Sequence, residues 1–434
     1  MSNIVFILII FLVLMFLGVP VAFSLGIPCI LWVFFLHPGM PVTVVSQNVM
    51  SYMLSFTLIS MPGFLFVGRM MNTCGITDKL FKFAIAVVGR WRGGLAHANA
   101  LASMLFASMS GTAIGDAGGL GLVEMKMMKE AGYAPEEAAG ITAASSILGP
   151  IIPPSSCMIL LGSIAEVSVA SLFYGGIVPG VLLAGALMLN ISLYAHFTKA
   201  GRKWPRTRVP LKETLIATLK AIPAMGTFAI ILGTINFGIC TPTEAAIVAA
   251  WYAVFLGICY KKLTWKTFWA TLKDTVDACG VFMLIVSVAS LLAWEMTIEG
   301  LPSILRGFMA STMEVTGTTG LLLICCVVFL ILGCFLDTSA AILLTAPILM
   351  PVATSLGISA VHFGLIMVVA LMIGIITPPF GICLFVVAEV GQVPVKNVTK
   401  QAIRYLPAML IVLLLITLFP DVVLWLPRIC GLSV

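Results

Sequence analysis

The sequence predicts an all-α protein that crosses a membrane many times, and three observations predict it. Hydrophobic residues make up 61% and charged residues 9% of the 434 residues, whereas a soluble domain carries roughly 25% charged residues. Apolar stretches long enough to span a bilayer recur along the chain. Two of these stretches carry the same break, at Gly149 to Pro154 and at Gly374 to Pro379. Soluble, disordered and nucleic-acid-binding classes are therefore excluded.

Each break contains a pair of adjacent prolines. A proline inside a helix lacks the backbone N–H and clashes with the preceding turn, so paired prolines unwind the helix. Unwound backbone is tolerated at membrane depth only where protein buries it or where it lines a cavity. Matched interruptions in the two halves of an apolar chain point to the binding site of a transporter.

The remaining elements follow from the lengths of the apolar stretches. The N-terminal stretch has no basic region and no cleavage site, so we expect a retained helix and not a signal peptide. Two stretches with polar middles, at about 95–122 and 318–353, are interpreted as re-entrant hairpins. Spans are expected at about 4–36, 51–70, 138–165, 172–197, 221–237, 239–260, 276–294, 361–389 and 403–427.

Basic residues set the expected orientation. Cytoplasmic loops are enriched in Lys and Arg, and the segment 199–220 holds seven basic residues opposed only by Glu213. This segment is therefore interpreted as a cytoplasmic linker. Following the spans in both directions places the N-terminus inside and the C-terminus outside, with the loop of Glu295, Glu299 and Glu314 also outside.

The two halves repeat at the offset that separates Gly75 from Gly300. The same offset pairs Gly149 with Gly374 and the two proline pairs with each other. The early loop is basic in the first unit and rich in acids in the second, which predicts units of opposite orientation with a substrate site between them near mid-membrane. Chance likeness among Gly- and Pro-rich helices is the alternative.

The first hairpin carries small and hydroxyl side chains. Ser108, Ser110 and Thr112 provide oxygens, and Gly111 permits a turn. The segment from Gly149 to Ser156 is expected opposite, with exposed carbonyls. Neutral oxygens suit Na⁺, and broken helices in other transporters hold ions and substrates with their half-helix ends. Helix packing by small residues is the alternative interpretation.

The second hairpin carries Asp337 inside an apolar stretch, followed by Thr338 and Ser339. Charged residues at membrane depth are costly and usually functional. Asp337 is expected to cap the following half-helix, hold an ion or carry a proton, and Asp116 has the same possibilities. Near the outer face, Thr241 and Pro242 fit the start of a helix, and Glu244 is expected to support its N-terminal dipole.

No cofactor or metal centre other than Na⁺ is expected. The eleven Cys show no CxxC spacing and lie mostly in apolar stretches, where Cys acts as a small hydrophobe. The four His are scattered.

These motifs together resemble the large membrane subunit of the TRAP transporters (tripartite ATP-independent periplasmic transporters), over nearly the whole chain. Cys240 stands where that family usually has an aromatic or similar residue. The segments that carry the resemblance are 61–64 with 75–80, 110–112 with Asp116, 149–155, 240–246 and 374–381.

The resemblance implies a Na⁺-coupled, elevator-type importer of an organic acid in the bacterial inner membrane. Its expected partners are a separate small membrane subunit and a periplasmic substrate-binding protein. One Na⁺ would lie near Ser108, Ser110, Gly149, Ile152 and Pro154, and a second near Asp337, Gly374 and Thr377. Substrate contacts are expected at Gly111, Thr112, Asp116, Ser155, Ser156, Thr338, Ser339 and Pro378.

On this interpretation the hairpins and broken helices form the moving transport domain. Its two units span 95–198 and 318–402, and the scaffold comprises 1–94 and 221–317, with the linker 199–220 and a C-terminal helix in 403–434. The carboxylate carried and the residue that clamps it are not defined, since Arg69 and Arg306 are the only remote candidates for a clamp. An intramembrane hydrolase that uses Asp116, Asp337 or Ser110, and an ion channel, are the alternative functions.

Overall fold

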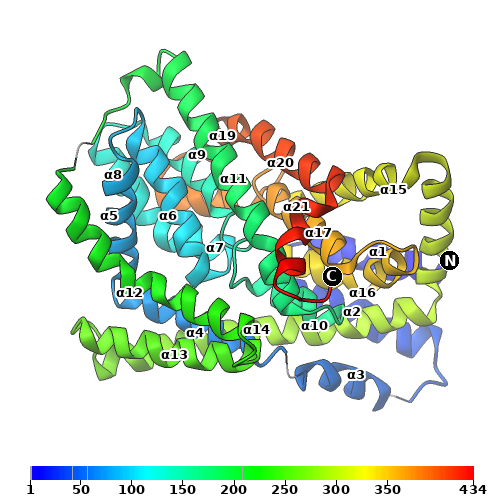
Figure 1. Ribbon diagram of the computed structural model, residues 1–434. Helices are drawn as coiled ribbons and strands as arrows, with labels where there is room; N and C mark the ends of the chain where they lie inside the picture. Colours follow the sequence, from blue (N-terminus) through cyan, green and yellow to red (C-terminus); the bar gives the residue numbers. More distant parts are fainter. Residues whose placement is uncertain (1, 42, 56, 208) are drawn as a thin grey trace.

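The computed structural model describes residues 2–41, 43–55, 57–207 and 209–434, with side chains for all of these except 2, 51, 52 and 107–110. Helices joined by turns make up this part of the chain (Figure 1). Seven of the described helices are long and apolar enough to cross a membrane, which confirms the predicted fold class. They are α11 (Val169–Phe197), α12 (Leu211–Asn236), α13 (Pro242–Cys259), α14 (Trp265–Ile298), α15 (Leu301–Phe335), α16 (Thr338–Ser355) and the continuous segment Val395–Leu418.

The first repeated unit begins with a helix and a short amphipathic arm. These are α4 (Ser60–Thr73) and α5 (Ile76–Val88). A hairpin comes next, and then a helix broken in the middle. The hairpin comprises α6 (Gly94–Ser110), α7 (Ala113–Gly115), the π-helical turn η2 (Asp116–Leu120) and α8 (Gly121–Glu130), and the broken helix comprises α9 (Pro135–Ser146) and α10 (Ser156–Ile164).

The second unit has the same order of elements. Helix α14 leads into α15, whose first half is an arm and whose second half starts the second hairpin, and the two halves meet at the non-helical residue Gly317. Helix α16 completes the hairpin. The broken helix is formed by α17 (Ala360–Gly374) and α18 (Ile382–Gly391).

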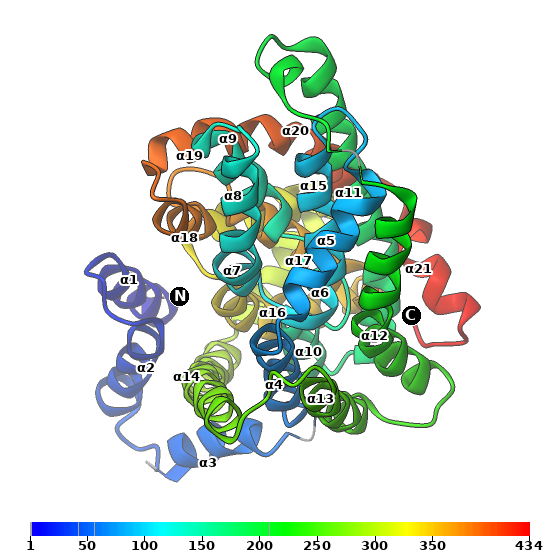
Figure 2. The same ribbon diagram turned by 90° about the vertical axis from the view of Figure 1, so that its left-hand side faces the viewer.

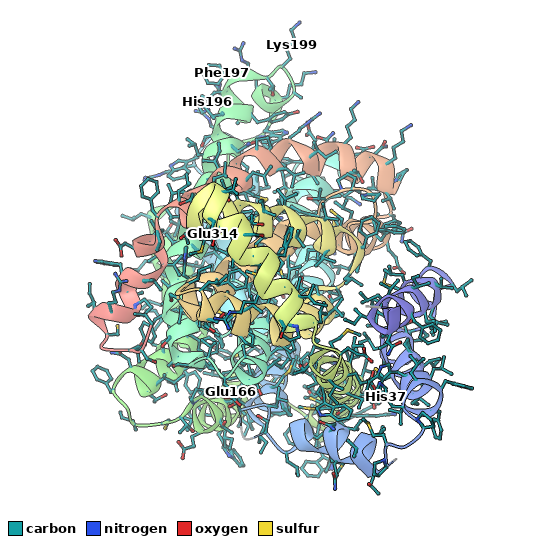
Figure 3. All side chains as sticks on the ribbon, turned by 90° about the vertical axis from the view of Figure 1, so that its right-hand side faces the viewer. His37, Glu166, His196, Phe197, Lys199 and Glu314 are labelled. Atoms are coloured by element: carbon teal, nitrogen blue, oxygen red, sulfur yellow. The ribbon has the colours of Figure 1, made fainter. Side chains whose placement is uncertain are left out.

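Matched backbone conformations confirm the repeat. Gly75 and Gly300 both precede their arms with positive φ, of 68° and 77°, and both proline pairs contain a cis peptide bond. The two arms lie at opposite ends of the molecule (Figure 1), and Figure 3 faces the second arm, where Glu314 is labelled. The two units therefore have opposite orientations, as predicted.

The other helices surround these units. Figure 2 shows α1 (Ser2–Phe16) and α2 (Val21–Leu31) on one flank, and α12 and α13 on the other. The end of α11 projects beyond its neighbours, with His196, Phe197 and Lys199 at the periphery (Figure 3). The remaining elements are η1 (Trp32–Leu36), α3 (Thr43–Met53), η3 (Gly201–Lys203), α19 (Val395–Ala402), η4 (Ile403–Tyr405), α20 (Leu406–Leu418) and α21 (Pro420–Ile429).

Three sequence-based boundaries are wrong. The expected single span at 4–36 is two helices, because the chain turns between Phe16 and Val21, where Pro20 precedes the second helix. The expected C-terminal helix is divided at Phe419, just before Pro420. The linker 199–220 is shorter than predicted, because α12 already begins at Leu211.

Candidate functional site

The tip of the first hairpin is seated on the break of the first broken helix. Thr112 caps α7, since its hydroxyl accepts a hydrogen bond from the backbone N–H of Gly115 at 3.2 Å. The carbonyl of Gly111 accepts hydrogen bonds from the Ser156 hydroxyl at 2.7 Å and from the Ser156 N–H at 3.4 Å. The predicted pairing of this hairpin with the segment from Gly149 to Ser156 is therefore confirmed.

Ser155 stabilises the break itself. Its hydroxyl donates to the Pro150 carbonyl and accepts from the Met158 N–H, so the side chain caps α10. Because the proline pair interrupts the helical hydrogen bonds, a side chain supplies part of what the backbone lacks. Ser155 is fully buried, and its observed role is structural.

The second tip is built in a similar way. The Asp337 carboxylate accepts a hydrogen bond from the Ser339 N–H at 2.9 Å and caps α16, which confirms the capping role considered for it. The Gly381 N–H donates to the Cys334 carbonyl at 3.1 Å, which ties the second break to the end of α15. Thr377 donates its hydroxyl proton to the Ile373 carbonyl at 2.7 Å.

A cavity of about 350 Å³ lies between the two tips and the helices α4 and α14. The first unit contributes Thr112 and Ser156, among others, and the second contributes Asp337, Thr338 and Ser339. The cavity therefore collects residues from both repeats in one place, as predicted. Its remaining lining is Met61, Leu65, Arg69, Ala113, Ile114, Gly115, Pro150, Cys157, Ala278, Phe282, Met372 and Ile375.

Several other predicted site residues are not part of the cavity lining, although some of them are next to lining residues in the chain. The predicted ion contacts of the buried first break remain predictions, and so do those of the second break. The side chains of Ser108 and Ser110 are outside the described part of the structure. The residues that do not line the cavity are Gly111, Asp116, Gly149, Ile152, Pro154, Ser155, Gly374, Thr377 and Pro378.

Arg69 is the basic residue of the cavity lining. The sequence places Arg69 at the end of the expected span 51–70, and in the structure it is helical, since α4 continues to Thr73. Met61, Leu65 and Arg69 are spaced by four residues and so share one face of α4, as Ala278 and Phe282 do on α14. That spacing was the signal in the sequence that would have placed Arg69 at the site. Arg306, the other candidate, is exposed on the arm of α15.

Away from the two tips, Glu244 has the role expected of it. Thr241 accepts a hydrogen bond from the Glu244 N–H at 3.3 Å, and Glu244 accepts from the Thr241 N–H at 2.7 Å. The motif at 240–246 is thus a reciprocal helix cap at the start of α13.

Two inverted units whose tips and broken helices meet at an internal cavity define a secondary transporter of the membrane. The sequence matches the model of the family described as "Tripartite ATP-independent periplasmic transporter, DctM component" over residues 8–422. The chain therefore belongs to this family, which confirms the resemblance. Its members are transporter subunits and not enzymes, so the hydrolase alternative is set aside.

Relatives and a solved structure agree with this assignment. The chain is 38% identical to the sialic acid TRAP transporter large permease protein SiaM of Vibrio cholerae, over 96% of each chain. It is 34% identical to the C4-dicarboxylate TRAP transporter large permease protein DctM of the same organism, over 95% of each chain. The YdaH transporter of Alcanivorax borkumensis shares the fold, with a TM-score of 0.62, 14% sequence identity and coverage of 87% of this chain and 88% of that one.

Proposed function

We propose that this chain carries an organic acid across the bacterial inner membrane through the cavity between the tips, together with Na⁺. The single observation that carries the proposal is that one cavity combines Arg69 with hydroxyls and half-helix ends from both repeats. A carboxylate needs such donors when it leaves water, and Arg binds it through two parallel N–H groups. Relatives named for sialic acid and C4-dicarboxylates agree with this class of substrate.

Na⁺ is proposed to bind where the tips meet the breaks. Na⁺ requires several oxygen ligands, and a cation near a carboxylate offsets part of its desolvation cost. The first site is assigned to the backbone around Gly149, Ile152 and Pro154 with Ser108 and Ser110. The second is assigned to Asp337, Gly374 and Thr377. Asp337 is half-buried, so its negative charge remains available to an ion while it caps α16.

The transport units are proposed to move as a body against the scaffold, as an elevator. In support, the cavity is lined by transport-unit tips on one side and by α4 and α14 on the other, so a relative shift of the two would change its access. A periplasmic binding protein is proposed to deliver the substrate. A small membrane subunit is proposed to complete the scaffold.

Reconstituted uptake tests the proposal. The chain, its small subunit and its binding protein are placed in proteoliposomes, with N-acetylneuraminate and succinate as labelled probes. Uptake of one probe is expected to require an inward Na⁺ gradient and the binding protein. Thr377→Ala and Ser110→Ala are expected to weaken the Na⁺ dependence, with Thr312→Ala on the exposed arm as the control.

Two results would contradict it. If both variants kept the wild-type Na⁺ dependence, the assigned ion sites would be wrong. If flux ignored the binding protein and appeared as unitary currents in planar bilayers, the chain would act as a channel.

A further inference from the structure

Two carboxyl groups inside the first transport unit belong neither to the proposed substrate cavity nor to the proposed Na⁺ sites. Asp116 opens the π turn η2, and Glu124 lies eight residues later in α8. Each residue is only 1% exposed. Within the described chain, none of their four carboxyl oxygens accepts a hydrogen bond. A buried, unpaired carboxylate is unfavourable, so such a group needs a counter-ion, a hydrogen bond or a proton.

Neutral polar groups on α6 and α9, which pack against η2 and α8, are hydrogen-bonded to one another. Asn99 of α6 donates to the Thr142 hydroxyl of α9 at 2.8 Å and accepts from the Ser145 hydroxyl at 2.6 Å. The Ser103 hydroxyl of α6, 1% exposed, lies near Asp116 and has no hydrogen-bond partner among the described residues. Asp116 thus has one free hydroxyl in its surroundings.

No described cation pairs with either acid. Helices α6, α9 and α18 pack around η2 and α8 (Figure 2). The Lys129 ammonium donates to the Gly391 carbonyl, His97 contacts the Ser192 hydroxyl at 3.2 Å, and Glu137 accepts from the Trp204 N–H at 2.7 Å. The other titratable groups on these elements, none bonded to the two acids, are Lys126, Glu130, Glu136, Cys383 and Glu389.

A proton fits this environment better than a metal ion does. Na⁺ would need several oxygen ligands beyond the carboxylates, and Asn99, Thr142 and Ser145 of the packed helices α6 and α9 are already hydrogen-bonded to one another. The described residues also contain no group of three or more metal-ligating side chains. A proton needs one carboxylate oxygen only, and Ser103 then accepts or donates a single hydrogen bond.

We propose that Asp116 and Glu124 form a proton-binding site in the transport unit, separate from the cavity between the tips. At neutral pH the pair holds at least one proton taken from water, as a new O–H bond on a carboxylate oxygen. Because Asp116 comes directly after the α7 segment that Thr112 caps, the bound proton lies beside the moving tip. The site does not depend on the proposed Na⁺ coupling or on the substrate.

Infrared spectroscopy of the purified full chain tests the proposal without a substrate. A protonated carboxyl gives a C=O stretching band that is distinct from carboxylate and amide bands. Glu295 of α14 is a third buried carboxyl without a described hydrogen-bond partner. All spectra are therefore recorded in a Glu295→Gln background, at neutral pH and without Na⁺. The probes are H⁺, by titration, and Na⁺, by addition.

The expected result is a protonated-carboxyl band that the double variant Asp116→Asn/Glu124→Gln removes and that each single variant weakens or shifts. Glu130→Gln, exposed on the same helix α8, should leave the band unchanged. Absence of the band in the parent protein would overturn the proposal even if the variants failed to fold. A band that survives unchanged in the double variant would overturn it too. A band that Na⁺ removes at constant pH would do the same, since the site would then bind Na⁺.

Discussion

At the residue scale, short polar side chains accept hydrogen bonds from backbone N–H groups that the interrupted helices leave without a partner. Thr112, Ser155 and Asp337 each cap the half-helix that comes after them. Ser, Thr and Asp are the residues that satisfy the free N–H groups of a helix start. Hydroxyls and carboxylates predicted to bind ions or substrate are thus also structural. Arg69 differs, because it lines the cavity and its side chain forms no hydrogen bond or ion pair with the described residues.

Arg69→Gln is expected to weaken binding of the transported anion roughly 10- to 150-fold. A hydrogen bond to a charged group contributes about 1.5–3 kcal/mol, and 1.4 kcal/mol is a factor of ten. Calorimetric titration of the purified complex measures the dissociation constant. Arg69→Lys should reduce the affinity for the anion less, and Arg306→Gln, on the exposed arm, should leave the affinity unchanged. An equal loss in Arg306→Gln would show a general effect of net charge and not a contact.

Gly374→Ala is expected to destabilise the protein by about 1–3 kcal/mol, the usual cost of overpacking. An added Cβ would lie 2.6 Å from the Cα of Gly333, so two backbones would have to separate. Thermal unfolding in detergent measures the effect. Gly233→Ala is the control, because nothing lies within 4 Å of its added Cβ. If both variants melted alike, the close approach of α15 and α17 would not matter to stability.

At the element scale, the two units connect the arm to the hairpin in different ways. In the first unit a turn separates the arm α5 from α6. In the second unit the arm and the start of the hairpin are two helical halves of α15 that meet directly at the non-helical residue Gly317, with φ 73° and ψ 174°. This conformation is strained for any residue with a Cβ, at a cost of about 1–3 kcal/mol. The bend therefore depends on a glycine at this position.

Gly317→Ala is expected to slow uptake several-fold while leaving the dissociation constant of the substrate within about twofold. The reason is that the strain falls on the joint between scaffold and hairpin and not on the cavity. Uptake rate and equilibrium binding are measured on the same preparation. Gly307→Ala, on the arm with no atom within 4 Å of its added Cβ, should change neither. Loss of binding in Gly317→Ala would mean that the bend shapes the cavity itself.

At the scale of the whole molecule, a few polar contacts join the scaffold to the transport units. The hydroxyls of Ser55, before α4, and Ser163, in α10, lie 2.9 Å apart. A cross-link at this contact would hold the two bodies in the described arrangement. Motion of one body against the other is part of the proposed elevator mechanism and is open to direct test here.

The double variant Ser55→Cys/Ser163→Cys is expected to lose most of its uptake on oxidation and to regain it after reduction. The physical reason is that a disulfide fixes the distance between scaffold and transport unit. Uptake is measured before and after each treatment. The two single variants, which retain the same eleven native cysteines, are the controls. Undiminished uptake by a fully cross-linked protein would contradict movement at this contact.

Most of the fold can be predicted from the sequence because its signals are local. The length of an apolar run, a proline pair or a capping residue acts within a few turns, so hairpins, breaks and the repeat were all predictable. Errors arose at 16–21 and at Phe419, where a short interruption divides an apolar run. Hydrophobicity alone cannot show such a division. The site was predicted as a meeting of two tips and two breaks.

The individual side chains of the site were harder to predict, because the direction in which a side chain points depends on its position around the helix axis. Arg69 lies at the end of the expected span 51–70, and it lines the cavity because it shares one face of α4 with Met61 and Leu65. Asp116 is not part of the cavity lining. It begins a π turn that no sequence pattern predicts. Such a turn shifts the helical phase of the residues in α8 that come after it.

The sequence by itself determined that this is a membrane protein of two inverted units with broken helices, and it carried enough motifs to indicate the family. Only the tertiary structure decided which faces of α4 and α14 close the cavity and which acids are sealed inside the first unit. The physical reason is the distance along the chain over which each effect acts. Composition and proline act along the chain, whereas a cavity and a buried charge are set by helices that are distant in sequence and are brought together by packing.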